Sequence, residues 1–316
     1  MIDYAEITKH LYKDKLCFDE LQLSASYSSG WEKYYLKGVN DMEVWHNVPN
    51  NILKVKGSLP YYWQGHNFAF AREDLIHSIQ DITGRLKINL WEAEMAKFEF
   101  GTIIEALVKP GELIRHHLEI PGKKTKPISP DFKIFAGNLQ ILKLYDAGRN
   151  IKNKLNNSIR GFLTNEYGYD KERHYLKVEN HYIKPYKVLN NGIQILVNDL
   201  LNPDFYQHCK SDLITQYESI MKTQPNPIPT DKKALSAGGI ILLAFEEAGK
   251  HFNISAEELI NFKLKEIPSE ILNQNDKKAR KRQIKEMMKR ISGGGSQARG
   301  EYDLTALIEA KLMLEN

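Results

Sequence analysis

The sequence predicts an α/β protein of the α+β kind, with a central, mostly antiparallel sheet flanked by helices and a small helical C-terminal domain. Strand-like and helix-like runs alternate through the first two thirds of the chain. A segment with three prolines in five positions, 223–230, then interrupts the pattern, and helical spacing follows it. The predicted domains are residues 1–222, a linker at 223–231 and a helical basic domain at 232–316.

Composition excludes several classes of protein. The 316 residues carry 44 Lys and Arg against 40 Asp and Glu, and 42% are hydrophobic, as in a folded globular chain. Two cysteines, Cys17 and Cys209, exclude a disulfide framework and favour a reducing compartment. The longest apolar run, 237–245, is shorter than the ~20 residues that span a bilayer, and the first residues lack the pattern of a secretion signal. We therefore expect a soluble cytoplasmic protein with no membrane partner.

Helical spacing predicts helices over 72–86, over 109–118 and, in a basic stretch, over 151–160. After the linker, we expect helices over 234–250, from the capping box Ser255-Ala256-Glu257-Glu258 onward, over 277–290 and over 304–313. The run of glycines after Ser292 is expected to end the third of these helices.

Alternation of apolar and polar residues predicts the strands. The run 51–60 followed by 61–70 is interpreted as two strands joined by a Gly57-Ser58-Leu59-Pro60 turn. Further strands are predicted over 96–104, 139–145 and 174–183.

The predicted helix at 277–290 is strongly basic. It holds eight Lys and Arg residues, Arg280 and Arg282 among them, against the single acid Glu286. A cluster of this density can neutralise nucleic-acid phosphates. The alternative is a basic helix that only contacts solvent.

Three predicted strands share one local pattern, found in Lys97-Phe98-Glu99, Lys143-Leu144-Tyr145 and Lys177-Val178-Glu179. Since successive side chains of a strand point to opposite faces, one face of each is apolar. The other faces carry Lys97, Glu99, Lys143, Tyr145, Lys177, Glu179 and His181. If the strands are neighbours, these groups share one surface. The alternative is an ordinary solvated face with Lys–Glu pairs across the strands.

This set of side chains suits phosphoryl chemistry. Carboxylates with an imidazole are ligands for Mg²⁺ or Mn²⁺, which can polarise a phosphoryl oxygen. Tyr145 stands at the end of its strand, before a turn into a basic helix. A phenol has a pKa near ~10, so a nucleophilic tyrosine needs a metal or base nearby. Most tyrosines are packing residues, and Tyr61, Tyr62 and Tyr175 are the chief rivals for this role.

The ordered set of motifs resembles the replication initiators of filamentous phages, the gene-two and gene-X type, which have relatives on rolling-circle plasmids. The resemblance covers roughly residues 50–215, and the C-terminal part is similar only in being helical and basic. The matching stretches, in chain order, are Gly57-Ser58-Leu59-Pro60, Trp63-Gln64-Gly65-His66-Asn67-Phe68, Lys97-Phe98-Glu99, Leu142-Lys143-Leu144-Tyr145-Asp146 and Leu176-Lys177-Val178-Glu179.

The resemblance implies a metal-dependent endonuclease that nicks one strand of origin DNA, keeps a covalent 5′-phosphotyrosine and later rejoins the strand. Tyr145 would be the nucleophile, and Lys143 or Arg149 would contact the scissile phosphate. Glu99 and Glu179, with His66 as a third candidate, would hold Mg²⁺ or Mn²⁺. The expected partners are duplex and single-stranded origin DNA and a host helicase or polymerase in a bacterial cytoplasm. The residues expected to contact DNA are Asn67, Lys97, Lys177, Arg280 and Arg282.

The chain departs from the family pattern in places. Ala147 stands where relatives carry a lysine two residues after the tyrosine, and Glu99 where they often carry Asp. The chain also lacks the His-hydrophobe-His pair that marks the commoner rolling-circle nucleases. His116 and His117 are adjacent, so in a helix they would diverge by about 100° and could not chelate as a spaced pair does.

Other interpretations remain open at the level of sequence. His66 could be a hydrogen-bonded structural residue, and Asn67 could cap a turn. The protein could be a non-enzymatic DNA-binding protein whose sheet is only a scaffold, or a metal nuclease that uses water in place of tyrosine.

Overall fold

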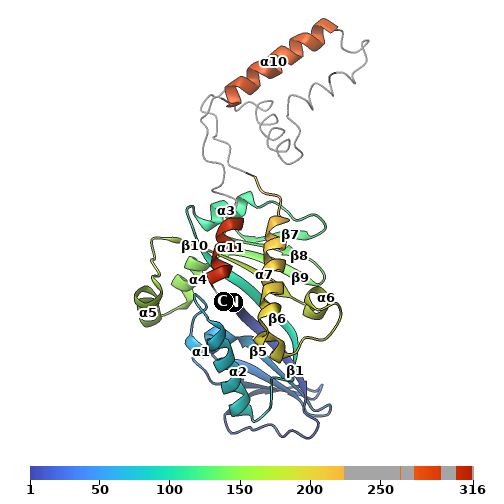
Figure 1. Ribbon diagram of the computed structural model, residues 1–316, viewed down its shortest axis with the longest axis vertical. Helices are drawn as coiled ribbons and strands as arrows, with labels where there is room; N and C mark the ends of the chain where they lie inside the picture. The colour runs from blue at the N-terminus through green and yellow to red at the C-terminus, as the bar shows by residue number, and fades with distance from the viewer. Residues whose placement is uncertain (224–263, 265–273, 293–303, 315–316) are drawn as a thin grey trace. The chain divides into compact units, whose positions relative to one another are not determined.

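The computed structural model describes residues 1–223, 264, 274–292 and 304–314. The chain divides into two compact units, one formed by Met1–Ile220 with Asp303–Asn316 and the other by Met221–Tyr302. The first unit confirms the predicted α+β class, since it is built on a single ten-stranded sheet with flanking helices (Figure 1). None of the helices in the described part of the chain is long and apolar enough to cross a membrane.

Every neighbouring pair of strands in the sheet is antiparallel. The spatial order is β2-β3-β4-β5-β1-β6-β10-β9-β8-β7, so the N-terminal strand lies in the middle. The strands are β1 (Ile2–His10), β2 (Leu21–Ser26), β3 (Trp31–Leu36), β4 (Met42–Asn47), β5 (Ile52–Ser58), β6 (Glu94–Ala106), β7 (Lys124–Ser129), β8 (Phe132–Ala136), β9 (Gln140–Asp146) and β10 (His174–Tyr182).

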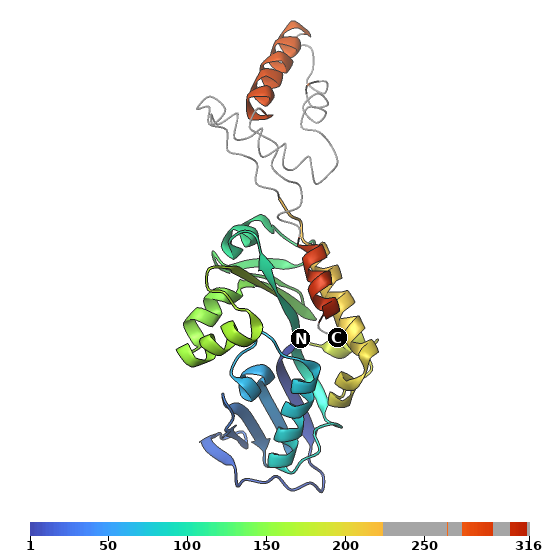
Figure 2. The same ribbon diagram turned by 60° about the vertical axis from the view of Figure 1, so that its left-hand side comes forward.

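Helices cover both faces of this sheet. Figure 2 shows α7 and α11, which lie side by side, on one face, and α4 and α5 on the other. The helices of this unit are α1 (Leu59–Gln64), α2 (Arg72–Leu86), α3 (Pro110–His116), α4 (Ala147–Lys154), α5 (Asn157–Tyr167), α6 (Pro185–Leu189), the 3-10 helix η1 (Val197–Leu201), α7 (Pro203–Glu218) and α11 (Thr305–Leu314). The predicted helices at 72–86 and 109–118 are therefore confirmed.

The three strands with the shared pattern are neighbours, as predicted, with β10 between β6 and β9. The register places Lys177 opposite Tyr145, Glu179 opposite Lys143, and His181 opposite Glu99. Because paired residues of neighbouring strands point to the same face, the predicted polar groups form one surface.

The opposite face of these strands is the core of the unit. Its six apolar side chains are fully buried, at 0% exposure: Phe98, Phe100, Leu142, Leu144, Leu176 and Val178. Phe98 contacts Phe205 and Phe100 contacts Tyr206, both on α7. Burying a side chain of this size contributes roughly 1.5–3 kcal/mol, so the apolar set fixes which way the strands face. The charged groups are thereby directed to the other side.

Two predicted elements are corrected by the structure. Residues 59–64 form α1 and not a strand, because Ser58 accepts a hydrogen bond from the Tyr61 amide as N-cap and Pro60 suits the first helical turn. The predicted helix at 151–160 is two helices, since α4 ends at Lys154 and Asn156 caps α5 through the Ile159 amide.

The C-terminal boundary is also corrected. The first predicted domain ends at 222, close to the observed break after Ile220, but α11 packs on α7 and β6 and so belongs to the first unit. Its Ile308 and Leu312 are buried, and the Leu304 amide donates to the Tyr217 hydroxyl (3.2 Å). The sequence could not show this return of the chain, because it depends on contacts with α7.

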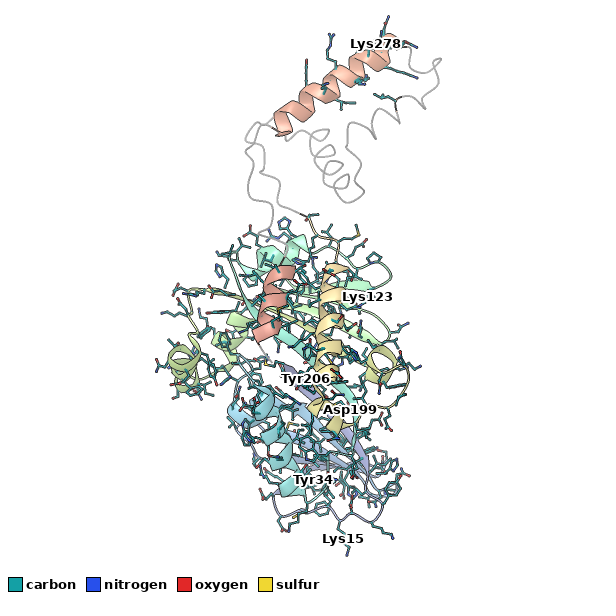
Figure 3. All side chains as sticks on the ribbon, in the orientation of Figure 1. Lys15, Tyr34, Lys123, Asp199, Tyr206 and Lys278 are labelled. Carbon is teal, nitrogen blue, oxygen red and sulfur yellow. The ribbon has the colours of Figure 1, made fainter. Side chains whose placement is uncertain are left out.

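In the second unit, the predicted basic helix is confirmed as α10 (Gln274–Ser292). Its cations Lys278, which is labelled in Figure 3, Arg280, Lys281 and Arg282 are exposed. The helices predicted over 234–250 and from Ser255, most of the linker and the glycine-rich segment after Ser292 lie outside the described residues.

Candidate active site

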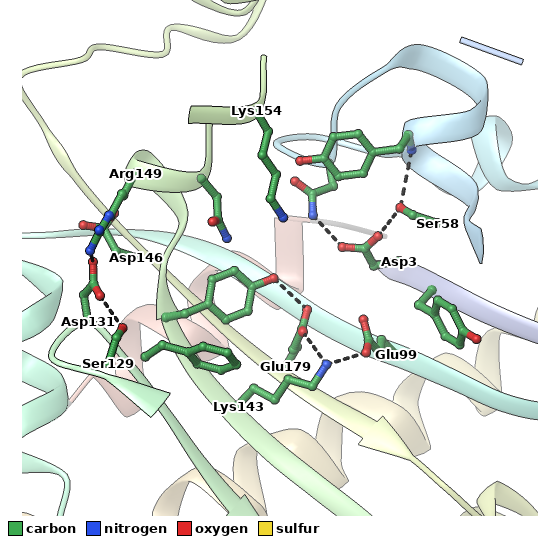
Figure 4. Close-up of a pocket in the computed structure, with 16 residues that line it drawn as sticks. Asp3, Ser58, Glu99, Ser129, Asp131, Lys143, Asp146, Arg149, Lys154 and Glu179 are labelled. Atoms are coloured by element: carbon green, nitrogen blue, oxygen red, sulfur yellow. Dashed lines mark hydrogen bonds and ion pairs between the residues drawn. The ribbon is translucent and has the colours of Figure 1, made fainter. Parts of the chain in front are cut away.

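A pocket of about 520 Å³ lies on the polar face of the central strands (Figure 4). Strands β1, β6, β9 and β10 form its floor, and α1 and α4 contribute its rim. The lining residues are Asp3, Tyr4, Ser58, Tyr61, Asn67, Glu99, Ser129, Asp131, Phe132, Lys143, Tyr145, Asp146, Arg149, Asn150, Lys154 and Glu179. The structure thus brings together most of the residues that the sequence predicted to be catalytic.

Three carboxylates meet at the floor of the pocket. One oxygen from each of Asp3, Glu99 and Glu179 lies within 4.8 Å of the others. They come from three neighbouring strands, β1, β6 and β10. Gly101, opposite Glu179, makes this close approach possible, because a Cβ there would lie 2.4 Å from the Glu179 Cβ and from the Val178 carbonyl oxygen.

Two lysines balance the charge of these acids. Lys177, only 1% exposed, is ion-paired with Asp3 and with Glu179 (3.0 Å). Lys143 pairs with Glu99 and with Glu179 (3.2 Å). Burial alone would lower the pKa of each ammonium, but the facing carboxylates outweigh it, so both pKa values are raised, that of Lys177 strongly. Both lysines therefore stay charged at neutral pH.

The position of Lys177 corrects one prediction. We expected this lysine to contact DNA from an exposed strand face, but its ammonium is enclosed by Asp3 and Glu179. Its function is that of a buried counter-ion. The alternation of the strand correctly predicted the face of Lys177, but not that other segments would cover it.

Asp3 is the carboxylate that the sequence reasoning missed. Ser58 and Asn67 donate hydrogen bonds to it, the latter at 2.5 Å, and Lys177 pairs with it. Burial raises its pKa, but Lys177 and these two donors more than offset that, so the pKa is lowered and the group is ionised. Strict alternation over residues 2–7 would place Asp3 on the face of the buried Ala5 and Ile7, and the pairing of β1 with β6 is irregular between Ile2 and Ala5, so local pattern gave no signal for this acid.

Tyr145 points into the same pocket from the end of β9. Its hydroxyl donates to Glu179 Oε2 (3.2 Å), and its ring packs edge-on against Phe132. Burial and the charge of Glu179 raise the pKa of the phenol well above 10, against a smaller opposing effect of Lys177. The next residue, Asp146, caps α4 by accepting from the Arg149 amide (2.8 Å), so the tyrosine has a rigid support.

Helix α4 brings cations to the rim. Arg149 is exposed and paired with Asp131, while the side chain of Lys154 extends into the pocket (Figure 4). Asn67 also lines the pocket, bonded to Asp3, and does not act as a turn cap through its side chain. Lys154 was not predicted here, and Tyr61, named only as a rival of Tyr145, also lines the pocket, because the fold places α1 and α4 at this rim.

His66 does not join the carboxylates, so the prediction that it is a third ligand is corrected in favour of Asp3. It is 1% exposed and its ring packs near Phe162 and Tyr167. Its Nδ1 lies 3.2 Å from the Gln64 amide nitrogen. Burial lowers its pKa to about 4, against a smaller opposing effect of Asp74. This is a neutral structural histidine.

Of four other predicted residues, two lie beside Glu99 and two belong to the second unit. Lys97 is on the same face of β6 as Glu99, partly exposed, and pairs with Glu6 (3.1 Å). His181 Nδ1 lies 2.9 Å from Glu99 Oε1, a contact that helps to fix the orientation of this carboxylate. Arg280 and Arg282 belong to the second unit.

The three acids fit a hard divalent cation, because carboxylate oxygens are the preferred ligands of Mg²⁺ and Mn²⁺. With Lys143 and Lys177, the cluster carries three negative and two positive charges, which leaves it attractive to a further cation.

A comparison of the chain with protein-family models, with curated proteins and with solved structures finds no match.

Proposed function

We propose that this protein is a metal-dependent DNA-nicking and strand-transfer enzyme of the kind that initiates rolling-circle replication. One observation carries the proposal: the Tyr145 hydroxyl contacts Glu179 within a three-carboxylate cluster, at the floor of an open pocket with cations at its rim. A nucleophile, a base and an anion-binding rim are what transfer of a DNA phosphoryl group to a protein side chain requires.

The proposed reaction begins with attack of the Tyr145 oxygen on a DNA phosphorus. The bond from phosphorus to the tyrosine oxygen forms, and the bond from phosphorus to the 3′ oxygen breaks. The phenolic proton passes to Glu179 Oε2, the atom it already contacts, and the departing 3′ oxygen, on the opposite side of the phosphorus, takes its proton from Lys143 or from water. The products are a 5′-phosphotyrosine and a free 3′ hydroxyl, and reversal of the same steps rejoins the strand.

The lysines and the acids have separate tasks in this scheme. Lys143, held charged beside Glu179, faces the pocket where it can contact the scissile phosphate, and Arg149 and Lys154 are placed for the flanking phosphates. Asp3, Glu99 and Glu179 would hold Mg²⁺ or Mn²⁺, which when bound supplies positive charge that favours the phenolate and stabilises charge on the phosphoryl oxygens. Ionisation of Tyr145 needs such help, since its pKa is raised.

The wider setting follows from the same proposal. The basic helix α10, with Arg280 and Arg282, would contact the backbone of origin DNA outside the pocket. The released 3′ hydroxyl would prime synthesis by a host polymerase, with a helicase separating the strands.

The test is capture of the covalent intermediate. The full chain is incubated with Mn²⁺ and a random-sequence pool of single-stranded DNA labelled at the 3′ end, the end that the 5′-phosphotyrosine retains. We expect a labelled protein band on a denaturing gel, mapping to the peptide that contains Tyr145 and lost in Tyr145→Phe. Tyr167→Phe, which changes an exposed tyrosine outside the pocket, is the matched control and should keep the band. An adduct at another residue would overturn the proposal.

A second candidate is a metal nuclease that uses water as its nucleophile. The observation in its favour is that one oxygen from each of Asp3, Glu99 and Glu179 lies within 4.8 Å of the others, a set that could hold an ion together with a water molecule. This candidate predicts nicked DNA with no protein adduct, and activity that survives Tyr145→Phe.

A further inference from the structure

The face of the sheet that holds the pocket continues over the N-terminal strands, where it is aromatic and basic. On β3, β4 and β5 the alternate side chains of one face are partly exposed: Trp31, Lys33, Tyr35, Glu43, Trp45, Lys54 and Lys56. Their neighbours on the other face are buried: Tyr34, Leu36, Met42, Val44, Leu53 and Val55. This alternation is that of a sheet packed on one side and open on the other. We call the open set the aromatic–lysine face.

The rings and cations of this face are in direct contact. The ammonium of Lys33 lies 4.8 Å from the centre of the Tyr35 ring, that of Lys54 lies 5.1 Å from Trp31, and that of Lys56 lies 4.9 Å from Trp45. The flexible lysines thus cover ring faces, an attraction of about 0.5–1 kcal/mol at an exposed site. A ligand with its own rings and negative charges can take the place of these lysines.

The rings have fixed orientations. Tyr27, exposed in the turn between β2 and β3, stacks on Trp45 with centres 5.5 Å apart and ring planes 20° from parallel. The Trp45 ring nitrogen donates to Glu43 (2.9 Å), and Glu43 is also paired with Lys33 (2.6 Å). Trp45 is therefore held in one orientation by contacts on several sides, as a stacking platform requires.

The charge of the surface favours an anion. This surface carries four lysines and two acids. The lysines are Lys33, Lys54, Lys56 and, on β6, Lys97, and the acids are Glu43 and Glu6. Glu43 pairs with Lys33, and Glu6 pairs with Lys97. The cations are in excess even after these pairs are formed, and their flexible stems allow them to reach the phosphates of a bound strand.

The aromatic–lysine face leads to the candidate active site without a break. Glu43, Lys56, Glu6 and Lys97 are register partners across β4, β5, β1 and β6, so they lie in one row on one face. Glu99 is two residues beyond Lys97 on the same strand and therefore on the same face. From strand spacing and rise per residue, Trp45 and Glu99 are on the order of 20 Å apart, a span of several nucleotides.

We propose that the aromatic–lysine face binds single-stranded DNA, whose bases stack on Trp45, Tyr35 and Trp31 while Lys54 and Lys56 contact its phosphates. Partly exposed rings on the open face of a sheet suit unpaired bases, because a base in a duplex has both faces covered by its neighbours. That the bound strand is also the strand cut at Tyr145 rests on the proposed function. The binding of single-stranded DNA to this face does not.

The test measures binding apart from chemistry. Fluorescence anisotropy follows a labelled thymidine oligonucleotide of 20 nucleotides with full-length Tyr145→Phe protein in EDTA, so that no strand is cut. We expect Trp45→Ala to weaken binding about tenfold, because the stacking surface for one base is lost. We expect Lys56→Glu also to weaken binding about tenfold, because a cation close to the DNA phosphates is replaced by an anion. The matched controls are Tyr186→Ala and Lys187→Glu, an aromatic–lysine pair with the ammonium 5.9 Å from the ring, on an element that packs against α7. These should bind as the parent does.

Each outcome decides between the proposals. Equal weakening by the test and control variants, or affinity for a blunt duplex as high as for the single strand, overturns the aromatic–lysine face as a single-strand site. Unchanged binding in Lys56→Glu overturns it as well, and does not depend on whether Trp45→Ala folds. If the predicted weakening is seen but the unmodified Tyr145 protein never forms an adduct, the surface stands and the proposed function fails.

Discussion

The two halves of the sheet use the same kinds of residue in opposite ways. On β1, β6, β9 and β10 the polar face forms the floor of the pocket, and its largely buried charges pair with each other: Lys177, Lys143, Asp3, Glu99 and Glu179 form one compact cluster. On β3, β4 and β5 the polar face is open, and its lysines lie over aromatic rings.

The difference shows how burial decides the function of a lysine. A buried ammonium is held in one place by carboxylates and is costly to lose, whereas an exposed one contributes little to folding and remains able to bind a ligand. Lys177 and Lys56 have similar sequence contexts, Leu-Lys-Val and Val-Lys-Gly on predicted strands, but belong to these two different classes.

The largest expected effect is on the buried cation. Lys177→Met should lower the free energy of unfolding by about 3–5 kcal/mol, because Asp3 and Glu179 lose a buried partner. Lys54→Met, in the open half, should cost about 0–1 kcal/mol, since its pair with Glu6 is long (4.0 Å) and partly exposed. Urea unfolding followed by circular dichroism measures both. Equal losses of unfolding free energy in the two variants would contradict the distinction between a buried and an exposed lysine in the two halves of the sheet.

The next effect concerns the close approach of β6 and β10. Gly101→Ala should cost about 1–3 kcal/mol and reduce adduct formation, because the new methyl group meets Glu179 and Val178. The matched control is Gly161→Ala inside α5, where a Cβ meets nothing within 4 Å and a helical alanine stabilises by roughly 0.5–1 kcal/mol. Thermal unfolding compares them, and the two shifts should have opposite signs.

A smaller loss of folding stability is expected when the pH is lowered. The folded-state pKa values of Asp3 and Glu99 lie below their ordinary values, because nearby lysines and hydrogen-bond donors outweigh burial. Groups with lowered pKa values stabilise the fold above their unfolded pKa, and that stability is lost as pH falls through the folded pKa. Stability should therefore decline from about pH 5 downward, less steeply in Asp3→Asn. Urea midpoints at a series of pH values measure the slope, and equal slopes would contradict the assignment.

The smallest expected effect is on the stability of the aromatic–lysine face. Lys56→Ala should change the free energy of unfolding by no more than about 0.5 kcal/mol, because the side chain is partly exposed and its contact is with the face of one ring. The same protein should bind single-stranded DNA more weakly. A loss of several kcal/mol in urea unfolding would mean that this half is held together by its lysines, like the other.

The fold class and four of the pocket residues could be predicted because side-chain direction along a strand is a local property. Alternation placed Glu99, Lys143, Tyr145 and Glu179 on the polar faces of their strands, and the pairing of those strands brings them into one pocket. The helix at 59–64 could also have been predicted, since Ser58 and Pro60 form a helix start, but the aromatic run after them was interpreted as a strand.

The parts that could not be predicted depend on which segments meet. His66 has the sequence context of a ligand, yet it is buried against Phe162 and Tyr167 of α5. Asp3 is the third acid only because β1 is inserted between β5 and β6, at the centre of the sheet.

Local pattern was therefore sufficient for the fold class, the polar face of the three patterned strands and the place of Tyr145 at the end of its strand, since each follows from residues a few positions apart. Only the folded chain decided which charges are buried together, that α11 returns to α7, and that an aromatic–lysine face adjoins the pocket. The physical reason is that these features come from pairing between distant segments: Lys177 and its partner Asp3 are separated by 174 positions, and no short-range periodicity records such a contact.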